Sequence, residues 1–213
     1  MSNLSTFLFD LDGTLIDSTE LIMSSFRYTM NVHLGMVPSE EEWRAGFGTP
    51  LRPQLARYAR SEKELVDMTA TYRAHNHEHH DRLVKPYSGI REVIAELKVR
   101  GSRMCIVTSK NKVGAERGLR HCALDGFFEA LVTADDVTEH KPSPIPVTEG
   151  LSRLNADAGQ AVFVGDSPHD CQAGRLAHVL TAGALWGPFT REKFKPYSPD
   201  YWLEHPHEIL RLE

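Results

Sequence analysis

The sequence predicts an α/β fold: a Rossmann-like, doubly wound parallel sheet with a small helical domain inserted after the first strand. Three observations predict it. A short apolar run, Phe7 to Phe9, stands near the start; the stretch that follows shows only helical patterns; and from Ile90 onward apolar runs alternate with amphipathic stretches. Such alternation is typical of a parallel sheet covered by helices on both faces. We therefore expect residues 1–16 and 86–213 to form the core, and residues 17–85 to form a helical cap.

The expected cap shows repeated helix-start signals and no convincing strand. Asp17, Ser39 and Ser61 are each followed three residues later by Glu, the spacing of a capping box. Apolar residues then recur at four-residue steps, which places them on one helix face: Ile22, Phe26, Met30 and Leu34. Linkers to the core are expected near Thr14–Ser18 and Leu83–Ser88.

The core resumes with a helix whose apolar face includes Ile90 and Val93, and Gly101 is expected to end it. Strands are then expected near Cys105, Leu131, Phe163 and Leu180, with helices between them. The helical block is thus an insertion that would cover the ends of the strands.

The composition fits one core plus a small accessory domain of an ordinary globular enzyme. The chain has 213 residues, 41% hydrophobic and 25% charged, with a formal net charge of −5. An acidic chain lacks the basic footprint of a nucleic-acid binder, and no apolar segment is long enough for a membrane span. The N-terminus has no signal-peptide pattern, and three scattered cysteines fit a reducing cytoplasm, so we expect a cytoplasmic protein.

Two carboxylates directly follow the first apolar run. Asp10 and Asp12 would point the same way if the strand continued through them, at the strand end where open α/β sheets bind ligands. Carboxylates so close repel each other unless a cation or a shared proton relieves them. One could act as nucleophile and the other as proton shuttle, with Mg²⁺ between them. The simpler alternative is an acidic turn, since Asp12-Gly13 is a common turn signal.

Further polar groups follow later strand candidates. The run ending at Val107 is followed by Thr108, Ser109 and Lys110, and the run ending at Val164 by Gly165, Asp166 and Asp170; Lys141 lies in a loop between them. Each has a structural alternative, because Thr-Ser pairs and aspartates often cap helices and a lysine before proline is often solvated. Their shared place at strand ends favours one catalytic site.

Together these segments resemble the four motifs of the haloacid dehalogenase (HAD) superfamily of aspartate-nucleophile phosphatases. The resemblance spans nearly the whole chain: Asp-x-Asp-Gly-Thr at 10–14, Thr108, Lys141-Pro142, and Gly-Asp-x-x-x-Asp at 165–170. Within the cap, residues 19–26 and 72–81 are similar to segments of bacterial inorganic pyrophosphatases of the PpaX type. Phosphoglycolate phosphatases share the superfamily motifs and are the next resemblance.

The resemblance implies a role for each motif residue. Asp10 would be the nucleophile that forms an aspartyl-phosphate, and Asp12 the acid and base. Mg²⁺ would be held by Asp10, the Asp12 backbone carbonyl and Asp166, with Asp170 as a direct or indirect partner. Thr108 and Lys141 would bind the transferring phosphoryl group. Dehalogenases of the superfamily have a non-acidic residue in place of Asp12, so the resemblance favours phosphoryl transfer.

Substrate choice is expected to come from residues around this centre and from the cap, and the partner is a small phosphorylated molecule. The candidates for substrate binding are Gly13, Thr14, Ser109, Lys110, Gly48, Arg52, Asn76 and His77. The cap histidines could equally be surface residues or form a transition-metal site.

The leading interpretation is a Mg²⁺-dependent hydrolase of inorganic pyrophosphate, acting as a monomer or homodimer. The alternatives are a phosphatase of a small organic phosphate such as phosphoglycolate, a mutase, and a non-catalytic phosphate-binding protein. The last would lack one of the motif carboxylates, and none is missing.

Overall fold

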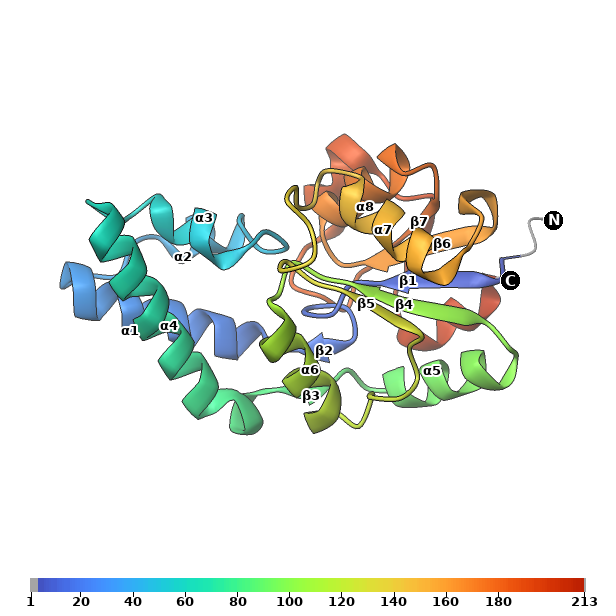
Figure 1. Cartoon of the computed structure of the whole chain (residues 1–213), viewed down its shortest axis with the longest axis horizontal. Helices are drawn as coiled ribbons and strands as arrows, with labels where there is room; N and C mark the ends of the chain where they lie inside the picture. Colours follow the sequence, from blue (N-terminus) through green and yellow to red (C-terminus); the bar gives the residue numbers. More distant parts are fainter. Residues whose placement is uncertain (1–3, 213) are drawn as a thin grey trace.

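A six-stranded parallel sheet forms the core of the computed structural model, which describes residues 4–212. The strand order is β5-β4-β1-β6-β7-β8, so the first strand is central (Figure 1). The strands are β1 (Thr6–Phe9), β4 (Arg103–Val107), β5 (Ala130–Val132), β6 (Ala161–Gly165), β7 (Leu180–Ala184) and β8 (Tyr201–Leu203). All five pairings are parallel, as the sequence predicts.

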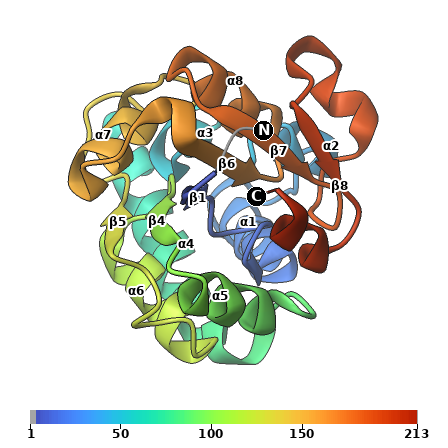
Figure 2. The ribbon, with the colours of Figure 1, turned by 90° about the vertical axis from the view of Figure 1, so that its right-hand side faces the viewer.

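Helices cover both faces of this sheet because alternate strand residues are apolar on both sides. Phe7 and Phe9 pack into one buried cluster, whereas Leu8 packs into the cluster on the opposite face. The first cluster includes residues of α5 (Ile90–Val99), α6 (Lys112–His121) and the short 3₁₀ helix η3 (Pro206–Arg211); the second includes residues of α7 (Ile145–Leu154) and α8 (Pro168–Leu176). Figure 2 shows these two groups on either side of the strands.

The inserted block consists of four helices that lie beside one end of the sheet in Figure 1. They are α1 (Thr19–Leu34), α2 (Glu40–Arg44), α3 (Leu51–Ala56) and α4 (Glu62–Leu83). Phe26 and Met30 of the expected α1 face are buried, and the Phe26 ring stacks on Trp43 with 4.3 Å between centroids. The same apolar cluster includes Phe189 and Phe194 of the core, so the cap packs directly on the sheet domain.

The two connections to the cap pair with each other. β2 (Ile16–Asp17) and β3 (Lys85–Pro86) form a two-stranded antiparallel ribbon, which the sequence pattern did not predict. We propose this ribbon as the boundary between the core, residues 1–16 and 86–213, and the cap, residues 17–85.

Two of the three expected helix caps make no capping hydrogen bond in the structure. α1 begins after Ser18 and has no side-chain cap, because the Asp17 carboxylate accepts only from the Thr19 N–H, at 3.3 Å. Ser39 also makes no capping bond. The Ser61 prediction is confirmed, since its hydroxyl accepts from the Glu64 N–H at 3.1 Å.

Two 3₁₀ segments complete the described chain, η1 (Ala158–Gln160) and η2 (Arg191–Tyr197). The edge strand β8 was not predicted from the sequence. Within residues 4–212, every helix is too short or too polar to cross a membrane.

Candidate active site

Three neighbouring strands bring their polar ends together. β4, β1 and β6 lie side by side and parallel, so the groups that follow them meet at one edge of the sheet. Asp10 follows β1, Thr108 follows β4, and Asp166 follows β6. All three are buried, as the strand-end argument requires.

Asp10 is held by a backbone donor and by a buried lysine. Its Oδ1 accepts from the Leu11 N–H at 2.7 Å and lies 3.0 Å from the Lys141 ammonium nitrogen. Burial raises the pKa of Asp10 to about 7; the positive charge of Lys141 opposes that rise, and the negative charge of Asp170 adds to it. Lys141 would lose basicity through burial, but Asp10 and Asp170 outweigh this effect and raise its pKa above the ordinary lysine value.

Three carboxylates form a cluster that suits a hard cation. Asp10, Asp166 and Asp170 each offer an oxygen, and these oxygens lie within 4.8 Å of one another. Burial, and then the negative charges of Asp170 and Asp10, raise the pKa of Asp166 well above the ordinary aspartate value. Buried carboxylates in this arrangement repel one another, and an all-oxygen donor set fits Mg²⁺.

Asp170 is fixed by the start of α8. Ser167 and Asp170 form a reciprocal capping box: the Ser167 hydroxyl and N–H donate to Asp170 Oδ2 at 2.6 and 3.0 Å. The other oxygen, Oδ1, accepts from Lys141 at 2.6 Å. The helix-capping alternative for this segment is therefore realised together with the carboxylate cluster.

The carboxylate of Asp12 does not join this cluster. Because β1 ends at Phe9, strand alternation does not extend to Asp12, so the condition under which its side chain would point the same way as that of Asp10 is not met. Asp12 Oδ1 instead accepts from the Ser18 hydroxyl at 2.6 Å and from Lys110 Nζ at 2.8 Å. Its predicted part in metal binding, through the backbone carbonyl, stays a prediction.

The turn after Asp12 packs tightly against the carboxylate cluster. Gly13 has φ of +87°, and a Cβ there would lie 2.5 Å from Asp166 Oδ2. The Thr14 hydroxyl donates to Asp166 Oδ1 at 2.9 Å. Gly187, after β7, lies against Asp166 and the Gly13 carbonyl so closely that a side chain would overlap them. Gly13 and Thr14 therefore shape the site, and Gly187 is a neighbour that the motifs did not reveal.

A loop of the cap reaches the core at this edge. The Ser109 hydroxyl donates to the Gly48 carbonyl at 2.6 Å. Gly48 has φ of +87°, and a Cβ there would lie 2.9 Å from the Ser167 hydroxyl and 3.6 Å from the His169 ring. Gly48 thus lies against the segment that carries Asp166 and Asp170, and its part in substrate binding stays a prediction. His169, whose pKa is lowered by burial, was not singled out from the sequence, although it lies between Asp166 and Asp170.

The remaining cap candidates separate into two groups. Arg52 is half-exposed and pairs with Glu62, and His77 is exposed, with its carbonyl accepting from Arg117 at 2.8 Å. Their part in substrate binding stays a prediction. Asn76 is partly buried and shares a helix face with Tyr72 and His80, at four-residue steps along α4.

The charges of Asp12 and Lys110 reach residues of that α4 face. Burial raises the pKa of Tyr72, and the charge of Asp12 raises it further. Burial lowers the pKa of His80, and the charge of Lys110 lowers it further. His75 and His79 lie toward α1 instead, where the His75 ring stacks on Tyr28 at 4.7 Å. Among the residues that the structure describes, the aspartate cluster is the single group with metal-ligand geometry, and it includes no histidine.

Comparison with known proteins places this geometry in a family. The model of the family described as haloacid dehalogenase-like hydrolase matches residues 7–184. The chain belongs to the haloacid dehalogenase-like hydrolases. As a member of this family, it combines the buried aspartate cluster with a helical cap, and the resemblance noted in its motifs is confirmed.

Relatives extend over almost the whole chain of this HAD hydrolase. It is 39% identical to pyrophosphatase PpaX of Anoxybacillus flavithermus, over 99% of this chain and 97% of that protein. It is 38% identical to pyrophosphatase PpaX of Bacillus cereus, over 98% and 96% of the two chains. The fold matches a solved structure from Haemophilus somnus, described as a predicted phosphoglycolate phosphatase, with TM-score 0.90 and 22% identity over 100% and 99%. The HAD hydrolase is therefore an enzyme of the phosphatase type.

Proposed function

We propose that this HAD phosphatase is a Mg²⁺-dependent hydrolase of inorganic pyrophosphate that works through an acyl phosphate on Asp10. One observation carries the proposal: a buried carboxylate, Asp10, lies in a cluster suited to a divalent cation, while a second carboxylate, Asp12, is held apart from that cluster by Ser18 and Lys110. Nucleophile and proton carrier thus have separate environments.

The residues that would hold Mg²⁺ are Asp10, Asp166, the Asp12 carbonyl and Asp170. When bound, the ion offsets the negative charge of the phosphoryl group and polarises one of its oxygens. Asp166 is positioned for this by the Thr14 hydroxyl, and Asp170 by Ser167 and Lys141. The buried cluster therefore needs little rearrangement to accept the cation.

Asp10 is oriented for attack by two donors on the same oxygen. The Leu11 N–H and the Lys141 ammonium group both lie at Oδ1, so Oδ2 is the oxygen that would bond to phosphorus as the phosphoanhydride P–O bond breaks. Lys141 and the Thr108 hydroxyl would bind the transferring phosphoryl oxygens. Asp12 would give a proton to the departing phosphate oxygen and then take one from the attacking water, which releases the second phosphate from Asp10.

The departing phosphate of pyrophosphate is small and highly charged, and therefore needs cationic or donor groups rather than an apolar pocket. Lys110, paired with Asp12 at 2.8 Å, supplies the cation beside the proton carrier. Asn76, on the α4 face that the charge of Asp12 reaches, supplies an amide. The names of the relatives, which match this chain along nearly its full length, support pyrophosphate as the substrate.

A phosphate-release panel tests the substrate. It would contain pyrophosphate, phosphoglycolate, sugar phosphates, nucleotides and phenyl phosphate, each at several concentrations with Mg²⁺. We expect the highest kcat/KM for pyrophosphate. A preference for phosphoglycolate would make the enzyme an organic phosphatase and refute the proposal.

Asn76→Ala and His77→Ala form a matched pair for the cap contribution. Losing one hydrogen bond to a charged group costs about 1.5–3 kcal/mol, so Asn76→Ala should lower kcat/KM for pyrophosphate by roughly ten-fold or more and affect phenyl phosphate far less. The exposed neighbour His77 should tolerate alanine on both substrates. Equal losses on both substrates for Asn76→Ala would mean that it only supports the cap.

A further inference from the structure

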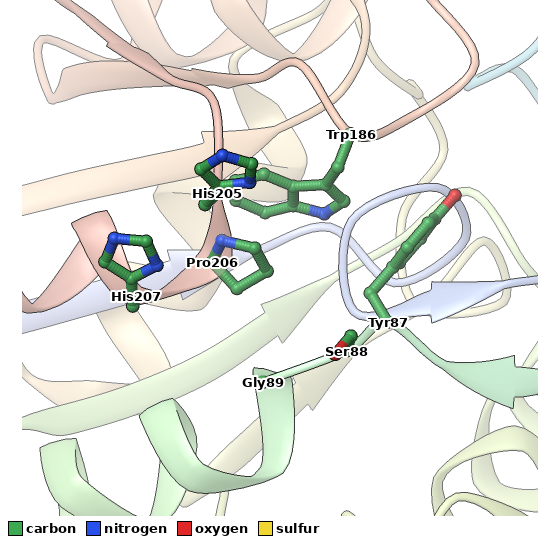
Figure 3. A pocket seen from close by; sticks show the side chains of 7 residues that line it. All are labelled: Tyr87, Ser88, Gly89, Trp186, His205, Pro206 and His207. Carbon is green, nitrogen blue, oxygen red and sulfur yellow. The ribbon is translucent and has the colours of Figure 1, made fainter.

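A hollow lies next to the turn that follows Asp12, where the core chain resumes after the cap. Its volume is about 510 Å³, and it is lined by Tyr87, Ser88, Gly89, Trp186, His205, Pro206 and His207 (Figure 3). These residues come from three segments: the linker between β3 and α5, the loop after β7, and the start of η3. Known small-molecule sites span about 300–1,000 Å³, so this hollow can hold a ring system with a substituent.

Aromatic side chains form much of its wall. Figure 3 shows the Trp186 and Tyr87 rings on one side of Pro206 and the His207 ring on the other. The His205 and His207 rings are stacked, with 5.6 Å between their centroids. Flat, partly exposed rings of this kind favour stacking with another planar ring.

The polar groups in the hollow suit a neutral ligand. The neutral imidazole of His205 offers one N–H donor and one acceptor nitrogen, and the Ser88 hydroxyl can both donate and accept. No Lys, Arg, Asp or Glu is among the seven lining residues, and the nearby Glu208 carboxylate accepts from the Glu204 and His205 N–H groups. A negatively charged ligand would meet that carboxylate without a compensating cation in the lining.

Two residues that line the hollow also donate hydrogen bonds to the turn that follows Asp12. Trp186 Nε1 donates to the Thr14 carbonyl at 2.9 Å, and the Tyr87 N–H donates to the Leu15 carbonyl at 3.1 Å. Thr14 in turn donates to Asp166, and Gly187, next to Trp186, packs against Asp166. A ligand that fixes the Trp186 and Tyr87 rings therefore also fixes the turn that positions the carboxylate cluster.

We propose that this hollow binds an uncharged planar heteroaromatic compound of the nucleoside class, and that its occupancy stabilises the turn from Leu11 to Ile16. The ligand ring stacks on the exposed aromatic faces of the lining, and its polar atoms bond to the His205 imidazole and the Ser88 hydroxyl. The site is separate from the carboxylate cluster, and the inference holds whichever phosphate ester or anhydride the enzyme hydrolyses.

Adenosine is the probe, added to the whole wild-type protein and followed by titration calorimetry and by ligand-observed saturation-transfer NMR. We expect saturable one-to-one binding. Tyr87→Ala should weaken it at least ten-fold, and Ser88→Trp, which fills the hollow from an exposed position, should abolish it. Tyr28→Ala, which removes a half-exposed tyrosine of the cap, is the matched control and should bind as the wild type does.

Hydrogen exchange provides the second measurement. Adenosine should slow exchange of the backbone amides of residues 11–16 in the wild type and leave them unchanged in Ser88→Trp. AMP should bind more weakly than adenosine, because the lining holds no Lys or Arg that could pair with its phosphate.

Three results would overturn the proposal. They are no binding of adenosine up to its solubility limit, equal binding by wild type and Ser88→Trp, and loss of binding when the catalytic site is saturated with Mg²⁺ and inorganic phosphate. The last would place adenosine in the catalytic site. None of these readouts requires turnover, so they are independent of the phosphate-release panel.

Discussion

At the scale of single residues, the site depends on one buried cation among three buried carboxylates. Lys141 lies 3.0 Å from Asp10 and 2.6 Å from Asp170, and both pairs are almost fully excluded from solvent. A charge in such surroundings is tolerated because each partner compensates the other. The residues proposed to perform the chemistry are therefore also the residues whose removal disturbs the electrostatic balance of the core.

Asp10→Asn should abolish turnover without unfolding the protein. An amide cannot form the acyl phosphate and is a poor Mg²⁺ ligand, so we expect a loss of roughly 10³-fold or more in kcat. Phosphate release measures it, with mass spectrometry to exclude deamidation and a thermal melt to check folding. Near-wild-type turnover by an Asp10→Asn variant shown to be free of deamidation would refute the proposed chemistry.

Lys141→Met should destabilise the metal-free protein as well as inactivate it. Removing one partner of a buried ion pair leaves an uncompensated charge, which costs about 3–5 kcal/mol, lessened here because the raised pKa of Asp10 lets it take up a proton. Mg²⁺ should therefore raise the melting temperature of Lys141→Met more than that of the wild type. An equal rise in both proteins would show that Lys141 does not balance the cluster. The exposed Lys195 provides a matched Lys→Met control.

At the scale of secondary-structure elements, the far end of α4 is tied to α6 of the core. Arg117 donates to Asp81 at 3.2 Å and to the His77 carbonyl at 2.8 Å, and Asp81 Oδ1 lies 2.7 Å from His80 Nδ1. His80 is 2% exposed, and its Nε2 is buried with no protein partner among the described residues. This contact fixes the end of the cap helix whose Tyr72 is reached by the charge of Asp12.

The His80 contact gives the stability of the protein a pH dependence. Burial lowers the pKa of His80, as do the charges of Lys110 and Arg117, while the bond to Asp81 opposes them. As the pH falls, His80 therefore takes up its proton at a higher pH in the unfolded chain than in the folded protein. The stability from neutral His80 is present above the ordinary histidine pKa and is lost as the pH falls through it toward the lower folded value.

His80→Gln should therefore show a smaller fall in melting temperature between pH 7.5 and pH 5.5 than the wild type. Asp81 does not add to this window, because Arg117 and His80 lower its pKa to about 2. His77→Gln, an exposed change three residues earlier on the same helix, is the control and should follow the wild type. Parallel curves for all three proteins would contradict the assignment.

The sequence allows elements with a local pattern to be predicted, and fails where long-range contacts decide. Five of the six core strands and the apolar face of α1 follow from period and turn residues, whereas β8 has three residues and forms only by pairing with β7. Motif spacing likewise leads to Asp10, Asp166 and Asp170. The pairing of Asp12 with Lys110, the approach of Gly187 to Asp166 and the outward direction of His77 depend on how distant segments pack, which spacing does not encode.

At the scale of the whole molecule, the cap and core meet over the carboxylate cluster. The Ser109–Gly48 bond and the packing of Gly48 against Ser167 bring a cap loop to the ends of β4 and β6. Closing a cap excludes water from the reacting groups and strengthens electrostatic interactions there. Under the proposed function, activity would depend on the cation, the core and the cap acting together.

Activity should require Mg²⁺, and Ca²⁺ should inhibit. Ca²⁺ takes more oxygen ligands in looser geometry and at longer distances, so it would misplace phosphorus relative to Asp10. Phosphate release is measured after exhaustive EDTA treatment, after Mg²⁺ addition, and with Ca²⁺ added at fixed Mg²⁺. Full activity of the EDTA-treated enzyme would disprove the metal assignment.

The central position of β1 has a consequence for folding during synthesis on the ribosome. Thr6 of β1 pairs with Arg103 of β4 and Ala161 of β6, so both neighbours of the first strand are synthesised only after the entire cap. Until then Phe7, Leu8 and Phe9, all fully buried in the finished fold, have no sheet to enter. Residues 7–9 therefore stay without their sheet partners while the cap helices emerge, and exposed apolar segments of this kind are prone to aggregation until the sheet forms.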